Sequence, residues 1–455
     1  MRMSYVPHTD ADRKAMLAAI GVRSVDELFA VIPQGFRFPE VALPAPLSEV
    51  EVMRELREIS ESNADLDHVP CFLGAGAYHH FVPSVVQHVL GRSEFYTAYT
   101  PYQPEISQGT LQTIFEYQSM ICGLTGMDVS NASHYDGATA MAEAVVMAMS
   151  VTRGKRRKAV LAPTIHPEYR QVVRTYTQGM EARIVGDEDA GAGIEALLKH
   201  LDEETACVIV QVPDFFGALE SPKALAALAD AAHKVGALFV VAADPISLGM
   251  LKPPAAYGAD IVVGEGQPLG IPVSFGGPYL GFFACREEYV RRMAGRLVGE
   301  TVDGQGRRGY VLTLATREQH IRRERATSNI CSNEALCALA AGVYLAALGK
   351  SGLRKVAGLC YHKAHYAADA IDSVPGFEVQ RDKPFFKEFV VRCPRPAAEV
   401  NDLLLDWEII GGYDLGRVDV RLADRMLVCV TEMNTRQEID DLAAALRAIA
   451  EGGAE

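Results

Sequence analysis

The stretch of sequence that decides the fold covers residues 236–286 and reads GALFVVAADPISLGMLKPPAAYGADIVVGEGQPLGIPVSFGGPYLGFFACR. Residues 238–243 form a short, continuous apolar run with the length of a buried parallel strand. Asp244 follows this run directly, and the carboxyl end of a strand is where open α/β sheets bind ligands. Two further apolar runs, at 260–263 and 279–284, flank a glycine-rich segment. The stretch therefore predicts buried strands with a candidate ligand site at Asp244.

The same order of short apolar strands and helices recurs upstream of this stretch. We expect strands over 159–162, 181–185 and 206–210, and each is followed by a segment with the periodicity of a helix. This alternation predicts a mainly parallel, doubly wound sheet.

Three parts are expected along the chain. Residues 1–70 read as a polar helical arm punctuated by prolines, too broken for a core of its own. Residues 71–350 hold the alternation of strands and helices and form the large domain. Residues 351–455 show the pattern of a small α+β domain, with strands expected over 388–392, 417–422 and 426–430.

The composition argues against several classes of function. The 455 residues are 49% hydrophobic and 22% charged, as in ordinary soluble globular proteins. The net charge of −14 argues against nucleic acid as a main partner, because phosphate binding needs a basic surface. No apolar run reaches the ~18–20 residues of a membrane span, and no secretory signal pattern is evident, so we expect a cytoplasmic protein. Nine cysteines without a CxxC pair, and the adjacent His79 and His80, give no pattern of a metal site.

Residues 95–109, FYTAYTPYQPEISQG, concentrate aromatic residues, prolines and one carboxylate. The prolines favour an extended loop over a helix. Tyrosine hydroxyls, an amide and a carboxylate on an ordered loop suit a small polar substrate, although ordinary packing is the other interpretation of such a cluster. The candidate substrate-binding residues are Tyr99, Tyr102 and Glu105.

The turn at 135–139, YDGAT, opens a helix rich in alanine and methionine. A glycine and a hydroxyl at a helix N-terminus form a ready anion site, because backbone amides meet the positive end of the helix dipole there. Asp136 places a negative charge beside this site, which would repel a phosphate dianion. We therefore prefer a helix cap to a phosphate site as the interpretation of this turn.

The order of Asp244, a second strand and a glycine-rich segment resembles the large domain of fold-type-I pyridoxal phosphate (PLP) enzymes. In that family an aspartate pairs with the pyridine nitrogen of PLP, and a lysine about one strand later forms the Schiff base. Asp244 matches the aspartate, whereas Gln267 stands in the place of the lysine, and an amide is no usable nucleophile. Lys252 is the only nearby lysine, and it precedes two prolines on what reads as an exposed loop.

Four longer sequence segments restrict the resemblance to one family within this fold type. The unusual ones are FLGAGAY at 72–78, YTPYQPEISQG at 99–109, YDGATA at 135–140 and RRERATSNIC at 322–331. Over nearly its whole length the chain resembles the glycine cleavage P-protein family, and within it the N-terminal, or alpha, subunits of the two-subunit type. Members of this group have lost the PLP lysine, which their beta subunits keep.

The resemblance implies the function of the alpha subunit of glycine decarboxylase, also called glycine dehydrogenase (aminomethyl-transferring). The complex, expected as an alpha2beta2 heterotetramer, would decarboxylate glycine on PLP and pass the aminomethyl group to the lipoyl group of the H-protein. PLP would be bound by the beta subunit, with none bound covalently by this chain. The chain would not be catalytic alone but would complete the beta subunit's active site.

The resemblance also implies roles for single residues. Tyr99, Tyr102 and Glu105 would belong to the loop that shapes the glycine site, acting in the partner's pocket. Thr327, in the string ATSN, would donate its hydroxyl to the phosphate of the partner's PLP. Three residues would mark the emptied cofactor pocket of this chain itself: Asp244, His166 and Gln267.

Two other interpretations stay open. The chain could be an independent PLP enzyme that uses Lys252 or binds PLP noncovalently. It could also be a purely structural or regulatory subunit that contributes no residue to any active site.

Overall fold

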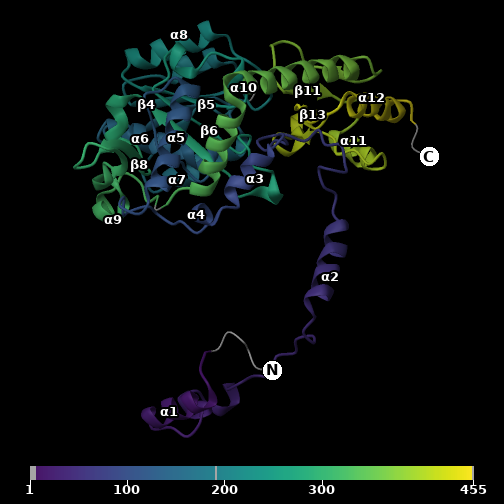
Figure 1. Cartoon of the computed structure of the whole chain (residues 1–455). Helices are drawn as coiled ribbons and strands as arrows, with labels where there is room; N and C mark the ends of the chain where they lie inside the picture. Colours follow the sequence, from purple (N-terminus) through teal and green to yellow (C-terminus); the bar gives the residue numbers. More distant parts are fainter. Residues whose placement is uncertain (1–6, 190–191, 331, 453–455) are drawn as a thin grey trace. The chain divides into compact units, whose positions relative to one another are not determined.

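The computed structural model describes residues 7–189, 192–330 and 332–452. Residues 1–6 of the predicted arm and Cys331, the last residue of the RRERATSNIC string, lie outside the described residues. The chain divides into two compact units, Met1–Ala64 and Asp65–Glu455 (Figure 1). Every predicted site residue belongs to the second unit.

The first unit consists of short helical elements. α1 (Asp10–Ile20) and α2 (Glu49–Glu61) each begin with a capping box. Two 3₁₀ turns lie between them, at Val25–Phe29 and Gln34–Phe36. No residue within these helices and turns is buried, so the described part of this unit has no hydrophobic core of its own.

A seven-stranded sheet forms the centre of the second unit. In the order β1-β7-β6-β5-β4-β2-β3, the five strands from β6 to β3 run parallel, while β7 is antiparallel to both β6 and β1. The mainly parallel sheet predicted from the sequence is therefore confirmed. The strands are β1 (Val129–Ser130), β2 (Lys158–Leu161), β3 (Arg183–Val185), β4 (Thr205–Val212), β5 (Leu238–Ala243), β6 (Ile261–Glu265) and β7 (Gly281–Cys285).

Strand β5, the run that ends at Asp244, lies in the middle of this sheet, and all of its residues are buried. α6 packs against the strands from β4 to β7, and α8 packs against β5, so one continuous apolar core surrounds the sheet. A hairpin of β8 (Leu297–Val302) and β9 (Arg308–Thr313) packs against α5. The helices of this part are α3 (Ser84–Leu90), α4 (Ser93–Tyr96), α5 (Gln108–Thr125), α6 (Gly137–Val151), α7 (Pro167–Thr177), α8 (Pro222–Lys234) and α9 (Gln319–Arg322).

A second sheet of four antiparallel strands lies near the C-terminus, in the order β10-β11-β13-β12. It has a separate apolar core, to which α12 and the end of α10 (Ala335–Asp372) contribute (Figure 1). The elements are β10 (Glu378–Val379), β11 (Glu388–Arg392), α11 (Ala397–Leu405), β12 (Tyr413–Asp414), β13 (Arg425–Cys429) and α12 (Arg436–Ala450).

The strand predicted over 417–422 is wrong. The chain forms two 3₁₀ turns there, at Leu415–Arg417 and Val420–Leu422. The carboxylates of Asp414 and Asp419 accept hydrogen bonds from backbone N–H groups two residues further on. Such local bonds compete with a sheet ladder and favour turns.

α10 (Ala335–Asp372) connects the two sheets of the second unit (Figure 1). Gly349 interrupts its helical backbone, with φ of 57° and ψ of −175°, next to the domain boundary predicted at residue 350. By length and composition α10 could cross a membrane, which the sequence analysis did not anticipate, but the core helix of a globular protein meets the same criteria. Its buried residues are shared between the two apolar cores, so we interpret α10 as a core helix.

Candidate functional site

The candidate site predicted at Asp244 is a small cavity at the carboxyl ends of β4, β5 and β6. Its volume is about 50 Å³, room for about three or four water molecules. Small-molecule sites commonly enclose roughly 300–1,000 Å³. The cavity is small because side chains of the chain itself fill the space, among them Tyr78, Lys387 and Glu388.

Lys387 occupies the side of the cavity next to Asp244. Its Nζ lies 2.6 Å from Oδ2 of Asp244 and 3.4 Å from the centre of the Tyr78 ring. Both side chains of the ion pair are largely buried. Burial opposes ionisation of Asp244, but the Lys387 ammonium outweighs it and lowers the carboxyl pKa, while Asp244 raises the pKa of Lys387 against the effect of burial. Both groups are therefore charged at neutral pH.

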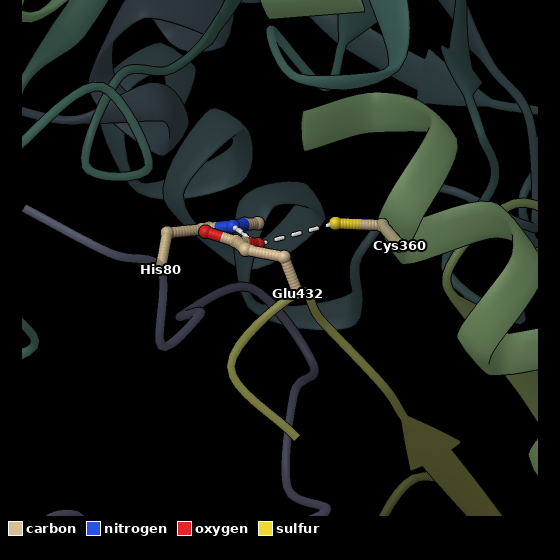
Figure 2. A group of neighbouring side chains, drawn as sticks. All are labelled: His80, Cys360 and Glu432. Carbon is tan, nitrogen blue, oxygen red and sulfur yellow. Dashed lines mark hydrogen bonds and ion pairs between the residues drawn. The ribbon is translucent and has the colours of Figure 1, made fainter. Parts of the chain in front are cut away.

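A chain of polar contacts continues from Lys387 to α10. Lys387 Nζ lies 3.3 Å from Nε2 of His80, and Nδ1 of His80 lies 2.7 Å from Oε2 of Glu432. The thiol of Cys360, on α10, donates to the same oxygen at 3.3 Å (Figure 2). The ammonium has only donors, so Nε2 of His80 must be the acceptor and Nδ1 carries the proton that binds Glu432.

This protonation pattern bears on metal binding. His80, Cys360 and Glu432 offer a nitrogen, a sulfur and an oxygen within 4.8 Å of one another, as Figure 2 shows. A metal ion at Nδ1 would require the proton of His80 to move to Nε2, where it would face the Lys387 ammonium. The cluster is therefore arranged as a hydrogen-bonded extension of the Lys387–Asp244 pair.

Two carboxylates of the chain itself occupy the helix N-terminus that could have bound a phosphate. Asp136 caps α6 by accepting the N–H of Thr139 at 2.7 Å, so the cap preferred in the sequence analysis is confirmed. Oε2 of Glu265 accepts the N–H of Gly137 at 2.9 Å. Burial raises the pKa of Glu265 to about 7, while three backbone N–H groups stabilise its ionised form.

Gln267, at the predicted lysine position, is almost completely buried and has its amide fully used. Its Oε1 accepts the N–H of Tyr78 at 3.0 Å, and its Nε2 donates to the carbonyls of Tyr78 and Ile271. An amide can donate and accept at once, which a lysine cannot do. Gln267 thereby fixes the backbone at Tyr78, whose ring contacts Lys387.

His166 also lines this cavity, and it is the N-cap of α7. Nδ1 accepts the N–H of Glu168, and Nε2 lies 2.8 Å from the carbonyl of Ala75, to which it donates. The imidazole stacks on Tyr169 at 4.8 Å between ring centres. Asp244 and His166 both line this cavity, and Gln267 bonds to the backbone of Tyr78, which lines it too. That the three residues mark an emptied cofactor pocket stays a prediction.

The other predicted residues lie elsewhere in the second unit. Tyr99 and Glu105 are exposed, and neither forms a hydrogen bond with another described residue. The hydroxyl of Tyr102 accepts a bond of 3.1 Å from Arg296, which lines a cavity of about 20 Å³ together with Thr327. Tyr102 and Thr327 are therefore linked through Arg296, and neither lines the cavity at Asp244.

Three residues of this site, Lys387, Tyr78 and Glu265, were not predicted from the sequence. A Schiff-base lysine is expected close to Asp244 in the sequence, whereas Lys387 comes from a segment 143 residues further on, directly before β11. Its sequence, Phe385-Phe386-Lys387-Glu388-Phe389, carries a signal that could have been used. A lysine among aromatic residues that read as buried needs a buried anion as its partner.

Residues 3–446 match the model of one family, described as glycine cleavage system P-protein. The chain belongs to this family. A relative from Thermomicrobium roseum (strain ATCC 27502 / DSM 5159 / P-2), named probable glycine dehydrogenase (decarboxylating) subunit 1, is 56% identical over 98% of this chain and 99% of its own length. A relative of the same name from Desulforamulus reducens (strain ATCC BAA-1160 / DSM 100696 / MI-1) is 54% identical over 98% of this chain and all of its own length.

Solved structures agree with this assignment. The structure described as glycine decarboxylase (P-protein) of the glycine cleavage system, in inhibitor-bound form, matches with a TM-score of 0.89 and 44% identity over 98% of this chain and 100% of its own. The sphingosine-1-phosphate lyase Bpss2021 of Burkholderia pseudomallei K96243 matches with a TM-score of 0.62 and 15% identity, over 92% of this chain and 96% of its own, which shows the fold alone. The predicted fold-type-I architecture of PLP enzymes is confirmed.

The P-protein family depends on PLP, but the residues of this pocket do not fit that cofactor. Asp244, which would face the pyridine nitrogen, is bound to an internal ammonium. Gly137, whose N–H would face the phosphate, is bound to Glu265. Gln267 supplies no amine. No step of a reaction can therefore be assigned to this pocket.

Removing one member of the buried ion pair tests its structural importance. We expect Lys387→Met to lower the free energy of unfolding by about 3–5 kcal/mol, because Asp244 is left buried and unpaired. Urea unfolding of the purified protein measures this. The double variant Asp244→Leu/Lys387→Met should recover most of the loss, because two apolar side chains need no partner.

Lys383→Met, which breaks a more exposed pair with Glu220, serves as the control and should cost about 1 kcal/mol or less. Equal losses for the two single variants would contradict this account.

The lowered pKa of Glu432 predicts that the stability of the protein depends on pH. Burial opposes its ionisation, but His80 and the N–H of Phe81 outweigh burial and lower its pKa from 4.5 to about 2. A lowered carboxyl pKa stabilises the fold fully above pH 4.5, and this contribution is lost as the pH falls towards 2. Urea unfolding at pH 6 and pH 3 should show a drop in the free energy of unfolding that is smaller in Glu432→Gln by about 2 kcal/mol. The exposed Glu399 gives the control variant Glu399→Gln, which should behave like the wild type; an unchanged drop in Glu432→Gln would contradict the prediction.

Proposed function

We propose that this chain is the alpha, or first, subunit of a two-subunit glycine decarboxylase of the glycine cleavage system. Its nearly full-length similarity to proteins named glycine dehydrogenase (decarboxylating) subunit 1 supports this function. The complex would release CO2 from glycine and transfer the aminomethyl group to the lipoyl group of the H-protein. An alpha2beta2 assembly in the cytoplasm is the proposed setting.

The Lys387–Asp244 ion pair is the main observation behind the proposal that the second subunit, and not this chain, binds the cofactor. A PLP-dependent reaction needs a site where the cofactor fits, and the pocket of this chain is filled by its own side chains. PLP would accordingly be held by the second subunit, on a lysine of that chain. When bound there, PLP supplies the electron sink for decarboxylation.

The contribution of this chain to catalysis would come from its surface residues. Tyr99 and Glu105 are exposed on the 97–107 loop, and the bond from Arg296 fixes the hydroxyl end of Tyr102. Thr327 is partly exposed, and its hydroxyl has no partner among the described residues. We propose that the loop orients glycine and that the Thr327 hydroxyl donates to the PLP phosphate, both in the second subunit's pocket.

The alternative of an independent PLP enzyme has little support. Lys252 is exposed, as the sequence predicted, and it lines a mainly apolar cavity of about 540 Å³ that Asp244 does not line. Its amine is therefore exposed to solvent and lies outside the pocket that Asp244 lines. Noncovalent binding would have to displace both Lys387 and Glu265 from their buried partners.

Reconstitution tests the proposed function. We expect the purified chain to be colourless and inactive after incubation with PLP, because its pocket offers neither space nor a lysine. Together with a second subunit that carries the lysine, it should give a visible PLP band and release CO2 from glycine in the presence of lipoylated H-protein. A borohydride-reducible PLP band in this chain alone would overturn the assignment.

A second experiment separates an active-site contribution from a purely structural one. In the reconstituted complex, Tyr102→Phe should lower CO2 release about tenfold, which corresponds to one lost hydrogen bond of functional geometry. Tyr96→Phe is the matched control, because Tyr96 is equally exposed and forms no hydrogen bond through its hydroxyl to another described residue. Equal activity of the two variants would support the structural or regulatory alternative.

A further inference from the structure

The segment 326–330, Ala-Thr-Ser-Asn-Ile, carries the hydroxyl of Thr327 but has no regular secondary structure. It forms one wall of a cavity of about 500 Å³, and residues of α6 form another. A segment without helix or strand has few backbone bonds to fix it. Its conformation therefore depends on the side chains that attach it to the body of the protein.

Ser328 provides that attachment. Its hydroxyl donates to Oε1 of Glu143 on α6 at 2.5 Å, and its oxygen accepts the N–H of Ile330 at 3.0 Å. Within the described part of the chain, these are the bonds that hold residues 327–330, and Ser328–Glu143 is the one that reaches another element. Thr327 is adjacent to Ser328 in the sequence, so the position of Glu143 fixes that of the Thr327 backbone.

Glu143 is unusual in its surroundings. It is the only ionisable residue of α6, and 6% of its surface is exposed. Its second oxygen, Oε2, has no hydrogen-bond partner among the described residues. A buried carboxyl group opposes stability, so an apolar residue would pack at least as well here. Burial raises the pKa of Glu143 to about 7, and the neutral and ionised forms both keep an oxygen that accepts from Ser328.

We propose that Glu143 is a positioning residue for the cofactor site of the second subunit. Through Ser328 it holds residues 326–330 so that the Thr327 hydroxyl meets the phosphate of PLP bound by that subunit. This inference rests on the proposed function, because it takes the Thr327 hydroxyl as the group that reaches the partner's cofactor.

The affinity of the reconstituted complex for PLP, titrated by visible absorbance, tests this proposal without relying on catalytic activity. Glu143→Leu removes the acceptor and should weaken PLP binding about 5- to 30-fold, the size expected for one lost hydrogen bond. Glu143→Gln keeps an amide oxygen for Ser328 and should bind PLP nearly as tightly as the wild type. Ser328→Ala should resemble Glu143→Leu, because it removes the other partner of the same bond.

Thermal unfolding separates positioning from a general loss of structure. The melting temperature of Glu143→Leu should equal or exceed that of the wild type, because the substitution removes a buried carboxyl group. Tyr176→Phe is the control variant: Tyr176 lines the same cavity and forms no hydrogen bond through its hydroxyl to a described residue. It should leave PLP affinity unchanged.

A double-mutant cycle with Thr327→Ala completes the test. If Glu143 acts through Thr327, adding Glu143→Leu to Thr327→Ala weakens PLP binding no further. Additive losses would overturn the proposal, as would a Glu143→Leu complex that binds PLP like the wild type. If Thr327→Ala itself leaves PLP affinity unchanged, the proposed role of Thr327 is wrong and the inference falls with it. An effect of Thr327→Ala without one of Glu143→Leu contradicts the inference alone.

Discussion

The buried ion pair between Lys387 and Asp244 is the interaction on which the rest of the pocket depends. It joins the end of β5 to the residue before β11, and so links the large sheet to the smaller one. A buried charge is stable only with a close partner of opposite sign and further hydrogen bonds. The N–H groups of Ile246 and Ser247 satisfy the other oxygen of Asp244, and His80 receives a further hydrogen of Lys387. The pocket is thereby stable without a cofactor.

The same principle explains the other end of the pocket. A helix N-terminus without an anion leaves N–H groups unsatisfied, and Asp136 and Glu265 supply two carboxylates of the chain itself. Gln267 satisfies the backbone at Tyr78 and keeps that segment in place. Each position that could have contacted a part of PLP is therefore bonded to a group of the protein itself. The pocket has the internal hydrogen bonds and ion pair of a buried polar core. The surface residues of the chain remain available to a partner subunit.

The sequence allowed the architecture around Asp244 to be predicted, because β5 is a continuous apolar run and its neighbours alternate with helices. The resemblance to fold-type-I PLP enzymes pointed to Gln267 and His166, and the roles it implies for them stay predictions. Lys387 could not be assigned in the same way, because nothing local connects it to Asp244 across 143 residues. The strand predicted over residues 417–422 is wrong for a different reason. The alternating valines of this segment resemble the pattern of a strand. However, Val420 is 83% exposed and Asp419 accepts a local hydrogen bond, so an extended backbone would bury no apolar face here.

The amount and location of PLP in the assembled complex test the central claim most directly. A crystal structure of the two subunits together, grown at saturating PLP, would give both. The account predicts one PLP for each pair of chains, located in the second subunit, with Lys387 of this chain still bound to Asp244. A second PLP in this chain, with its ring at Asp244 and Lys387 displaced, would contradict it.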